Sequence, residues 1–328
     1  MSRAPSWITA TDDSCMRSYA ACKPPLITCS SAPPTTRKKP LSSLTRYLYR
    51  RMLRKALIWV MGGLWAQAPE PLSLLNSMLD RLGTLRTLQY EFKKYERVRG
   101  KLLLEHMRFK LRRNPFAVYG YQYSPRAGVE VLYPAEPGSK RILVKPNSFP
   151  YVALTLDPYG DLILENQHQT ILATGYDQMR TLLLAAREKY RTQLKNLVRY
   201  EGSLTWDGRR CHKLVLSPPA YRITTYTVQA GENLFQIAEK LHVGWYKILE
   251  LNDLSSPTDP LPAGRVLKVP SDYGKVIRLI VDSERHIPLV IEVEDEKGLY
   301  ERYEYYKVEV DPPLTDFDFS RKNPAYKF

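Results

Sequence analysis

The sequence predicts an α+β fold, in which a large curved antiparallel sheet carries helices on its concave side and is joined by a small β-α-α-β module. Three observations support this prediction. Two amphipathic helical stretches lie at residues 71–88 and 177–197. Short segments of strand-forming residues, bounded by Pro and Gly, lie between these helices and after the second one. In residues 226–270 the apolar period changes from two to 3.6 and back to two.

The first helix and the strands after it follow from periodicity. The stripe of the helix at 71–88 consists of Leu72, Leu75, Leu79 and Leu82. Five strand-like segments come next, at 89–98, 102–111, 116–123, 129–133 and 141–145. The turns between them are short, as at Arg99-Gly100, and short turns favour antiparallel pairing.

The second helix precedes another group of strands. Its stripe consists of Met179, Leu183, Ala186, Tyr190 and Leu194. An Asp207-Gly208 pair then marks a β-hairpin, and three more strands are predicted at 276–281, 289–293 and 299–310. An order of helix, many antiparallel strands, helix and more strands indicates one curved sheet with helices packed against it.

The stretch 226–270 contains its own strand–helix–helix–strand pattern. Tyr226 and Val228 alternate as on a half-buried strand, and Gly231 ends that strand. Glu232 at the start of the next helix favours the positive end of that helix. The two helical stripes are Leu234, Ile237, Ala238 and Leu241, then Ile248, Leu251 and Leu254. Asn252 is suited to ending the second helix, and residues 266–269 return as a strand before Pro270.

This stretch closely resembles the LysM module, through Tyr226-Thr-Val-Gln-Ala-Gly231-Glu232-Asn-Leu234, Ile248-Leu249-Glu-Leu251-Asn252 and Leu261-Pro-Ala-Gly264-Arg-Val266. The resemblance implies a fold that binds N-acetylglucosamine-containing glycans such as peptidoglycan and chitin, in a groove between two loops. The glycan-binding positions that it implies are Gly231, Glu232, Asn233, Leu234, Asp253, Leu254, Leu261 and Pro262. From the residues alone, these positions are also consistent with ordinary turns in a module that binds nothing.

The rest of the chain resembles the periplasmic lipoprotein carriers LolA and LolB. The best local match runs from Met107-Arg-Phe109 through Arg113-Asn114-Pro115-Phe116 to Tyr119, and Leu314–Phe328 resembles the tail of a bacterial envelope family of unknown function. This likeness implies an unclosed half-barrel over an apolar cavity, formed by residues 69–225 with 271–328 around an inserted LysM domain at 226–270. Its lipid-cleft candidates are Arg113, Phe116, Tyr119 and Tyr121.

Two of these assignments have simpler alternatives. Arg113 aligns with the basic residue that the carriers need to release cargo, but beside Arg112 it also fits a solvated charge at a strand end. The alternating tyrosines, as in Tyr119-Gly-Tyr121-Gln-Tyr123, fit either a ligand cleft or the packing of a curved sheet.

The N-terminal residues predict export. Residues 1–51 are predicted to be a disordered or mis-annotated leader, since Met52 is a plausible start. Residues 52–68 have a basic start, an apolar run and a small-x-small site at Ala66-Gln-Ala68, as a secretory signal peptide does. The apolar run is too short to span a bilayer, which takes roughly 20 residues. The predicted location is therefore periplasmic or associated with the cell envelope.

The predicted cleavage changes the meaning of the net charge of +15. Residues 1–68 hold 11 of the 49 basic and 2 of the 34 acidic residues, which leaves 38 basic and 32 acidic residues and a charge of +6. This mild excess gives little support for a nucleic acid partner and suits an anionic wall or membrane surface. Only Cys211 remains in the mature chain, so no internal disulfide can form.

No catalytic set is evident in the mature chain. Its five histidines show no metal-binding spacing such as HExxH, and no Gly-rich phosphate loop is present. Cys211 and His212 are adjacent on a predicted strand, so their side chains point to opposite faces. We therefore predict a non-enzymatic protein without metal or cofactor.

Three hypotheses for the function follow. The first is an envelope protein that binds peptidoglycan through LysM and presents a carrier-like β domain to an acyl chain, a lipoprotein or an envelope partner. The second is a diffusible periplasmic carrier of lipid or lipoprotein, in which LysM only positions the exchange. The third is a peptidoglycan hydrolase that uses carboxylates on the sheet. Retention on peptidoglycan separates the first two, and glycan turnover would reveal the third.

Overall fold

The computed structural model describes residues 69–149 and 151–328. The predicted leader (1–51) and signal peptide (52–68) lie outside the described residues and remain predictions. Within the described ranges, no helix combines the length and the apolar character needed to cross a membrane.

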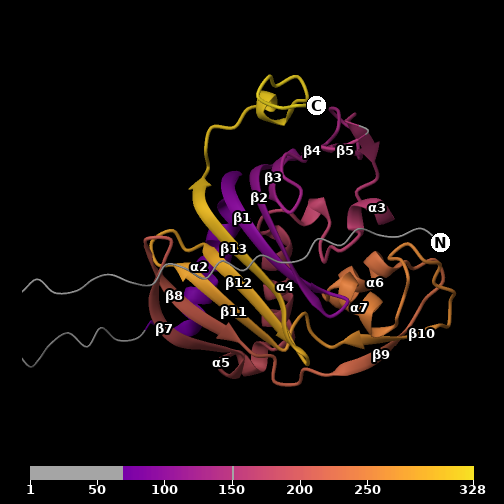
Figure 1. The fold of residues 1–328 in the computed structure, drawn as a ribbon. Coiled ribbons are helices and arrows are strands. Elements are labelled where there is room, and N and C mark those ends of the chain that lie inside the picture. The colour runs from indigo at the N-terminus through magenta and orange to yellow at the C-terminus, as the bar shows by residue number, and fades with distance from the viewer. Residues whose placement is uncertain (1–68, 150) are drawn as a thin grey trace, which may run out of the picture. The chain divides into compact units, whose positions relative to one another are not determined.

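In the described part of the chain, eleven strands form one antiparallel sheet in the order β6-β5-β4-β3-β2-β1-β13-β12-β11-β8-β7 (Figure 1). The edge strands β6 and β7 do not pair with each other, so the sheet stays open. The predicted α+β class with an unclosed antiparallel sheet is confirmed. The strands are β1 Thr87–Val98, β2 Lys101–Arg113, β3 Phe116–Ser124, β4 Glu130–Tyr133, β5 Ile142–Lys145, β6 Leu154–Leu156, β7 Val198–Trp206, β8 Arg209–Leu216, β11 Val276–Asp282, β12 Pro288–Asp295 and β13 Gly298–Val310.

The first helix, α2 (Pro71–Thr84), is shorter than the predicted 71–88. Leu75, Leu79 and Leu82 of its stripe are buried and Leu72 is half-buried, but Leu85 is already extended, with ψ of 138°. The carboxylate of Asp311, just after β13, accepts hydrogen bonds from the amides of Arg86 (2.7 Å) and Thr87 (3.3 Å). These bonds fix the start of β1 beside the end of β13, so residues 85–88 leave the helix.

The second predicted helix is interrupted. It consists of α4 (Asp177–Lys189), a 3₁₀ turn η2 (Arg191–Gln193) and α5 (Leu194–Leu197). Tyr190 leaves the helical conformation, and its hydroxyl donates to the carboxylate of Asp272 at 2.9 Å. Lys189 Nζ donates to the same carboxylate at 2.7 Å. These long-range contacts stabilise an ending that helical periodicity cannot reveal.

Each face of the sheet carries its own hydrophobic cluster. The main core lies where α2, α4 and α5 pack on the sheet, with Leu75, Leu79, Leu214 and Leu279 fully buried. A second cluster on the opposite face contains Tyr119 and Leu132, covered by Phe319 and Tyr326 from the C-terminal segment. The shorter elements are α3 Asp161–Leu164, η1 Ile171–Ala173 and η3 Asp316–Phe319. We call the eleven strands with α2–α5 and η1–η3 the sheet body.

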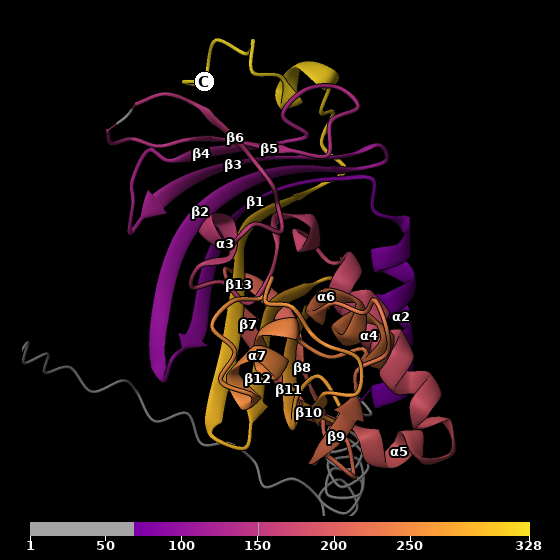
Figure 2. The same cartoon turned by 90° about the vertical axis from the view of Figure 1, so that its right-hand side faces the viewer.

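The inserted module occupies residues 223–270 and has the predicted β-α-α-β order. Its elements are β9 Ile223–Thr227, α6 Leu234–Leu241, α7 Trp245–Leu251 and β10 Val266–Pro270, and β9 pairs only with β10 (Figure 2). Asn252 ends α7 as predicted, because its Nδ2 donates to the carbonyl of Ile248 at 2.7 Å. The second helix of the module runs from Trp245 to Leu251, so Ile248 and Leu251 lie on it as predicted, whereas Leu254 lies beyond its end because Asn252 caps the helix.

Candidate functional site

A cavity of 420 Å³ lies on the concave face of the sheet. Its floor is aromatic: Tyr305 packs against Tyr90 and Phe92, with ring centroids 5.2 and 5.0 Å apart. Its roof comes from η1 and α4, through Ile171, Met179, Leu182 and Leu183. Helix α2, which was also expected to cover the cleft, contributes no lining residue. The cavity is therefore an apolar chamber between the sheet and α4.

The exposed lining residues mark where the cavity opens. Arg126 and Glu165 are exposed, and Leu162 in α3 is 67% exposed. The deeper walls consist of buried or half-buried apolar side chains. The mouth of the cavity therefore lies beside α3.

One end of the cavity is polar. Lys94 Nζ lies 3.1 Å from Glu96 Oε2 and 3.2 Å from Glu105 Oε2. Burial disfavours the ammonium, but the two carboxylates outweigh burial and raise the pKa of Lys94. Glu96 also keeps its charge, since Lys94 and His168 counter its burial and lower its pKa. This end of the cavity thus holds fixed charges in a buried setting.

Behind this polar end, three buried groups converge from distant parts of the chain. Glu96 (β1), His168 and Glu301 (β13) place one ligand atom each within 4.8 Å of one another, as a metal site would require. His168 Nδ1 lies 3.1 Å from Glu301 Oε2, and its Nε2 lies 3.1 Å from the carbonyl of Arg97. Both ring nitrogens therefore have hydrogen-bonding partners within the protein. The sequence offered no signal for this cluster, because its members are separated by 72 and 133 positions.

The four residues suggested by the carrier resemblance do not line this cavity. Arg113 binds the carboxylate of Asp177, with its Nε 2.7 Å from Oδ2, and donates to the carbonyls of Leu82 and Gly83 at 3.2 Å. It thus ties the end of α2 to the start of α4.

The aromatic members of that set also pack elsewhere. Tyr119 stacks on Tyr326 at 3.6 Å on the opposite face of the sheet, and Tyr121 joins the same cluster. Phe116 contacts Tyr133, with ring centroids 5.8 Å apart. Four tyrosines line the cavity instead: Tyr303 and Tyr305 of β13, Tyr90 of β1, and Tyr273 just before β11.

The predicted glycan-binding residues lie on two loops of the module. In the first loop, Gly231 is exposed, with φ of 80°, and Asn233 forms a capping box with Gln236 that begins α6. Glu232 lies before that cap rather than inside the helix, and accepts hydrogen bonds from Tyr226 (2.8 Å) and Lys240 (2.9 Å).

The other predicted glycan-binding residues differ in how far they are buried. Leu234 is buried in the core, and Leu254 and Leu261 are half-buried against it. Asp253 and Pro262 are exposed on the second loop. The exposed side chains at the predicted positions are therefore Asn233, Asp253 and Pro262, and Glu232 is half-buried.

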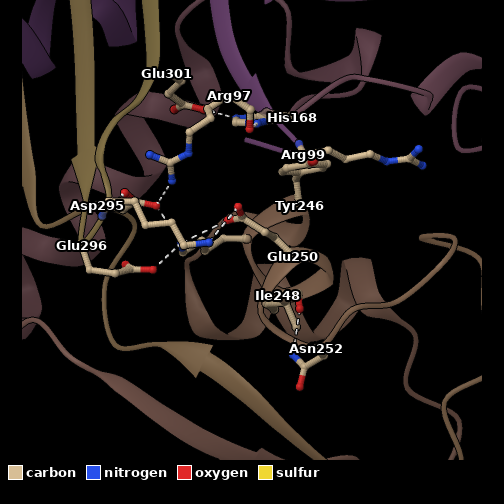
Figure 3. A network of polar contacts seen from close by, with 12 residues as sticks. Arg97, Arg99, His168, Tyr246, Ile248, Glu250, Asn252, Asp295, Glu296 and Glu301 are labelled. Atoms are coloured by element: carbon tan, nitrogen blue, oxygen red, sulfur yellow. Dashed lines mark hydrogen bonds and ion pairs between the residues drawn. The ribbon is translucent and has the colours of Figure 1, made fainter. Parts of the chain in front are cut away.

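The module is held on the sheet body by a buried polar network (Figure 3). Lys247 is 1% exposed, and its Nζ lies 2.7 Å from both Asp295 and Glu296 and 3.2 Å from Glu250. Asp295 also pairs with Arg97 of β1. Lys247 thus connects α7 directly to the turn between β12 and β13.

An aromatic stack reinforces this docking. The imidazole of His168 lies between the rings of Tyr246 and Tyr300, with centroids 4.4 and 4.3 Å away. The hydroxyl of Tyr246 accepts a hydrogen bond from the amide of Arg99 at 3.1 Å. The module is consequently fixed in one orientation rather than hanging from its two connections.

This network makes docking sensitive to acid. Burial opposes the charge of Asp295, but hydrogen bonds from Arg97 and Lys247 outweigh it and lower the pKa of the carboxyl. A depressed folded pKa stabilises the protein above the unfolded value of about 3.9, and the stabilisation is lost as the pH falls through the folded pKa. We expect Asp295→Asn to be less stable than the parent at pH 6 in urea unfolding, with the difference shrinking below about pH 4. A difference that stays constant from about pH 6 to about pH 3 would contradict this account.

Cys211 and His212 do not form a nucleophile–base pair in this structure. The thiol of Cys211 is buried in the main core and donates to the carbonyl of Arg209, and burial raises its pKa to about 11. His212 instead contacts Tyr200 and Ser203, with its Nδ1 3.4 Å from each hydroxyl. A thiol with so high a pKa is protonated at neutral pH and is a poor nucleophile.

Comparison with known proteins identifies the family of the chain. Residues 86–232 and 263–328 match the model of a family described as a protein of unknown function, DUF1571. The chain belongs to this family. Within this DUF1571 protein, residues 226–270 match the LysM domain, which confirms that resemblance over the range predicted. No curated protein matches the chain.

Several solved structures resemble this DUF1571 protein. Lipoprotein LppX of Mycobacterium tuberculosis is 15% identical, with a TM-score of 0.36, and the match covers 74% of this chain and 96% of LppX. LprF of Mycobacterium bovis is 12% identical, with a TM-score of 0.35 and coverage of 74% and 93%. An uncharacterized conserved protein of Thermus thermophilus is 10% identical, with a TM-score of 0.35 and coverage of 75% and 93%.

Proposed function

We propose that this protein is an exported, non-enzymatic component of the bacterial cell envelope. It binds an N-acetylglucosamine-containing glycan such as peptidoglycan through its LysM module, and it holds an apolar ligand such as an acyl chain in the sheet body. The observation that carries this proposal is the 420 Å³ cavity in a body to which a LysM module is rigidly docked. Its volume falls within the roughly 300–1,000 Å³ of small-molecule sites.

The shape and chemistry of the cavity favour an amphiphile. Its walls are mostly aliphatic and aromatic, while Lys94, Glu105 and Glu301 form a polar region at one end. Apolar surface buried on binding contributes roughly 25 cal/mol per Å². An acyl chain can therefore gain affinity along the walls, while hydrogen-bonding groups fix its position.

The glycan part of the proposal has a direct test. The chain from residue 69 onward is expected to pellet with purified peptidoglycan, and Asp253→Ala combined with Pro262→Ala is expected to reduce pelleting several-fold. Both side chains are exposed on the second loop, so their loss removes contacts without opening the core. Binding should be weak, because a shallow groove buries little surface against the cost of association.

The matched control changes two exposed residues on the module's strands, Thr224→Ala and Lys268→Ala. This control should pellet like the parent. Equal pelleting of parent and loop variant would exclude the second loop from the glycan site. A protein that fails to pellet at all would favour the second candidate function, a diffusible carrier of lipid.

The apolar site is tested with a fluorescent fatty-acid analogue. We expect saturable binding, and we expect Ile171→Trp to weaken it at least about tenfold, because the larger ring fills the cavity beneath α4. The control Leu102→Trp places the same ring on a half-exposed leucine that does not line the cavity, and should leave binding unchanged. Binding that does not saturate, or that Ile171→Trp leaves intact, would refute an apolar ligand in this cavity.

A further inference from the structure

The cavity and the glycan loops share one wall, the segment 157–165 that contains α3. On one side of this segment, Leu162, Ile163 and Glu165 line the cavity. On the other side, the carboxylate of Asp161 accepts hydrogen bonds from Ser256 (2.5 Å) and Thr258 (2.9 Å). Ser256 and Thr258 belong to the same loop as Asp253 and Pro262, so adjacent residues of α3 face the two predicted sites.

The first glycan loop is joined to the same segment. Tyr159 packs edge-to-face on Phe235, with ring centroids 5.0 Å apart. Phe235 directly follows Leu234 and lies in the first turn of α6, where the first loop ends. Segment 157–165 therefore contacts the module beside both loops and forms the mouth of the cavity.

Buried contacts hold the two sites in one position relative to each other. Lys247, fully buried among three carboxylates, and the stack of Tyr246 on His168 hold α7 on the sheet body (Figure 3). Two sites held rigidly side by side can bind one molecule with a gain from effective concentration, provided that the molecule spans them.

We propose that the cavity and the LysM loops form one continuous site for an amphiphile with an N-acetylglucosamine headgroup. The chain of this glycolipid occupies the cavity, passes Leu162 at the mouth, and places its sugar between the two loops. The proposal rests on the glycan and apolar sites proposed above and names a single ligand class for both. The proposal also explains the exposed position of Leu162 beside the glycan loops, because the acyl chain of the ligand would leave the cavity at this residue.

The test compares two amphiphiles with the same chain below their micelle concentrations, n-dodecyl β-chitobioside and n-dodecyl β-maltoside. Each displaces the fluorescent fatty-acid analogue from the protein. We expect the chitobioside to bind about tenfold more tightly than the maltoside, as linked binding of two weak parts provides. The double variant Asp253→Ala, Pro262→Ala should lose this preference and keep its affinity for the maltoside. The variant Ile171→Trp should weaken both.

Three results would overturn the inference. If the two amphiphiles bind equally while the protein still pellets with peptidoglycan and binds the fatty-acid analogue, the sites are independent and only the shared ligand is refuted. If the preference survives in the loop variant, the sugar lies elsewhere. If neither peptidoglycan nor the fatty-acid analogue binds, the proposed function fails together with the inference.

Discussion

A chain that ends at Thr225 is expected not to fold. Such a chain lacks β11, β12 and β13, which lie in the middle of the sheet between β1 and β8. Without them the sheet splits into a six-stranded part and the β7–β8 hairpin, and each part exposes unpaired edges and an apolar face. Circular dichroism and size-exclusion chromatography should show an unfolded or aggregated chain. A stable monomer would show that residues 69–225 are an independent domain.

Removal of the module should have a much smaller effect. The amide of Ser271 donates to the carbonyl of Arg222 at 2.8 Å, and the amide of Arg222 donates to Ser271 Oγ at 3.0 Å. Because the two connections already meet, residues 223–270 can be replaced by a short Gly linker without moving β8 or β11. We expect cooperative urea unfolding for this chain, with a loss of stability from exposing His168 and Tyr300. Non-cooperative unfolding would mean that the module is an integral part of the fold, against the predicted discontinuous domain around an insertion.

Lys247→Ala is expected to destabilise the protein strongly. The ammonium is buried, and its removal leaves Asp295, Glu296 and Glu250 close together with one cation fewer. Breaking a buried charge pair costs about 3–5 kcal/mol. We expect a loss near the lower end, about 3 kcal/mol, because Arg97 still pairs with Asp295. Urea unfolding at neutral pH measures it.

The control Lys268→Ala removes an exposed lysine from the same module. It should change the free energy of unfolding little, since surface substitutions away from buried networks have small effects. Hydrogen exchange provides a second measurement: in Lys247→Ala, the amides of α7 should exchange faster than those of β12. If Lys247→Ala unfolds like the parent, the network in Figure 3 does not hold the module in place.

Much of the fold could be predicted because its signals are local. The strands between Gln89 and Lys145 follow from alternating side chains and turn residues, and they occur close to the predicted positions. The module follows from spaced apolar positions, Gly231 and Asn252, whose roles depend on neighbours within a few residues. The predicted C-terminal ends of the two long helices were wrong, because hydrogen bonds to Asp311 and Asp272, which are distant in the sequence, end the helices earlier.

The residues that line the cavity could not be predicted from the sequence. The carrier resemblance pointed to Arg113, which the structure places in a clamp between two helices, because its partner Asp177 lies 64 positions away. It also pointed to Tyr119 and Tyr121, whose face of the sheet is covered by the C-terminal segment. Alternating side chains show that a strand has two faces, but they do not show which face carries the cavity and which face the C-terminal segment covers.

The fold class and the LysM module could be predicted from the sequence alone, because each depends on residue types at short spacing. The position of the cavity, the tyrosines that line it and the docking of the module could not be predicted in this way. Those features depend on pairs such as Lys247 with Asp295, and His168 with Glu301, which are 48 and 133 positions apart. In a sequence, polar residues of this kind look like ordinary surface residues, and only folding removes them from water and brings them together.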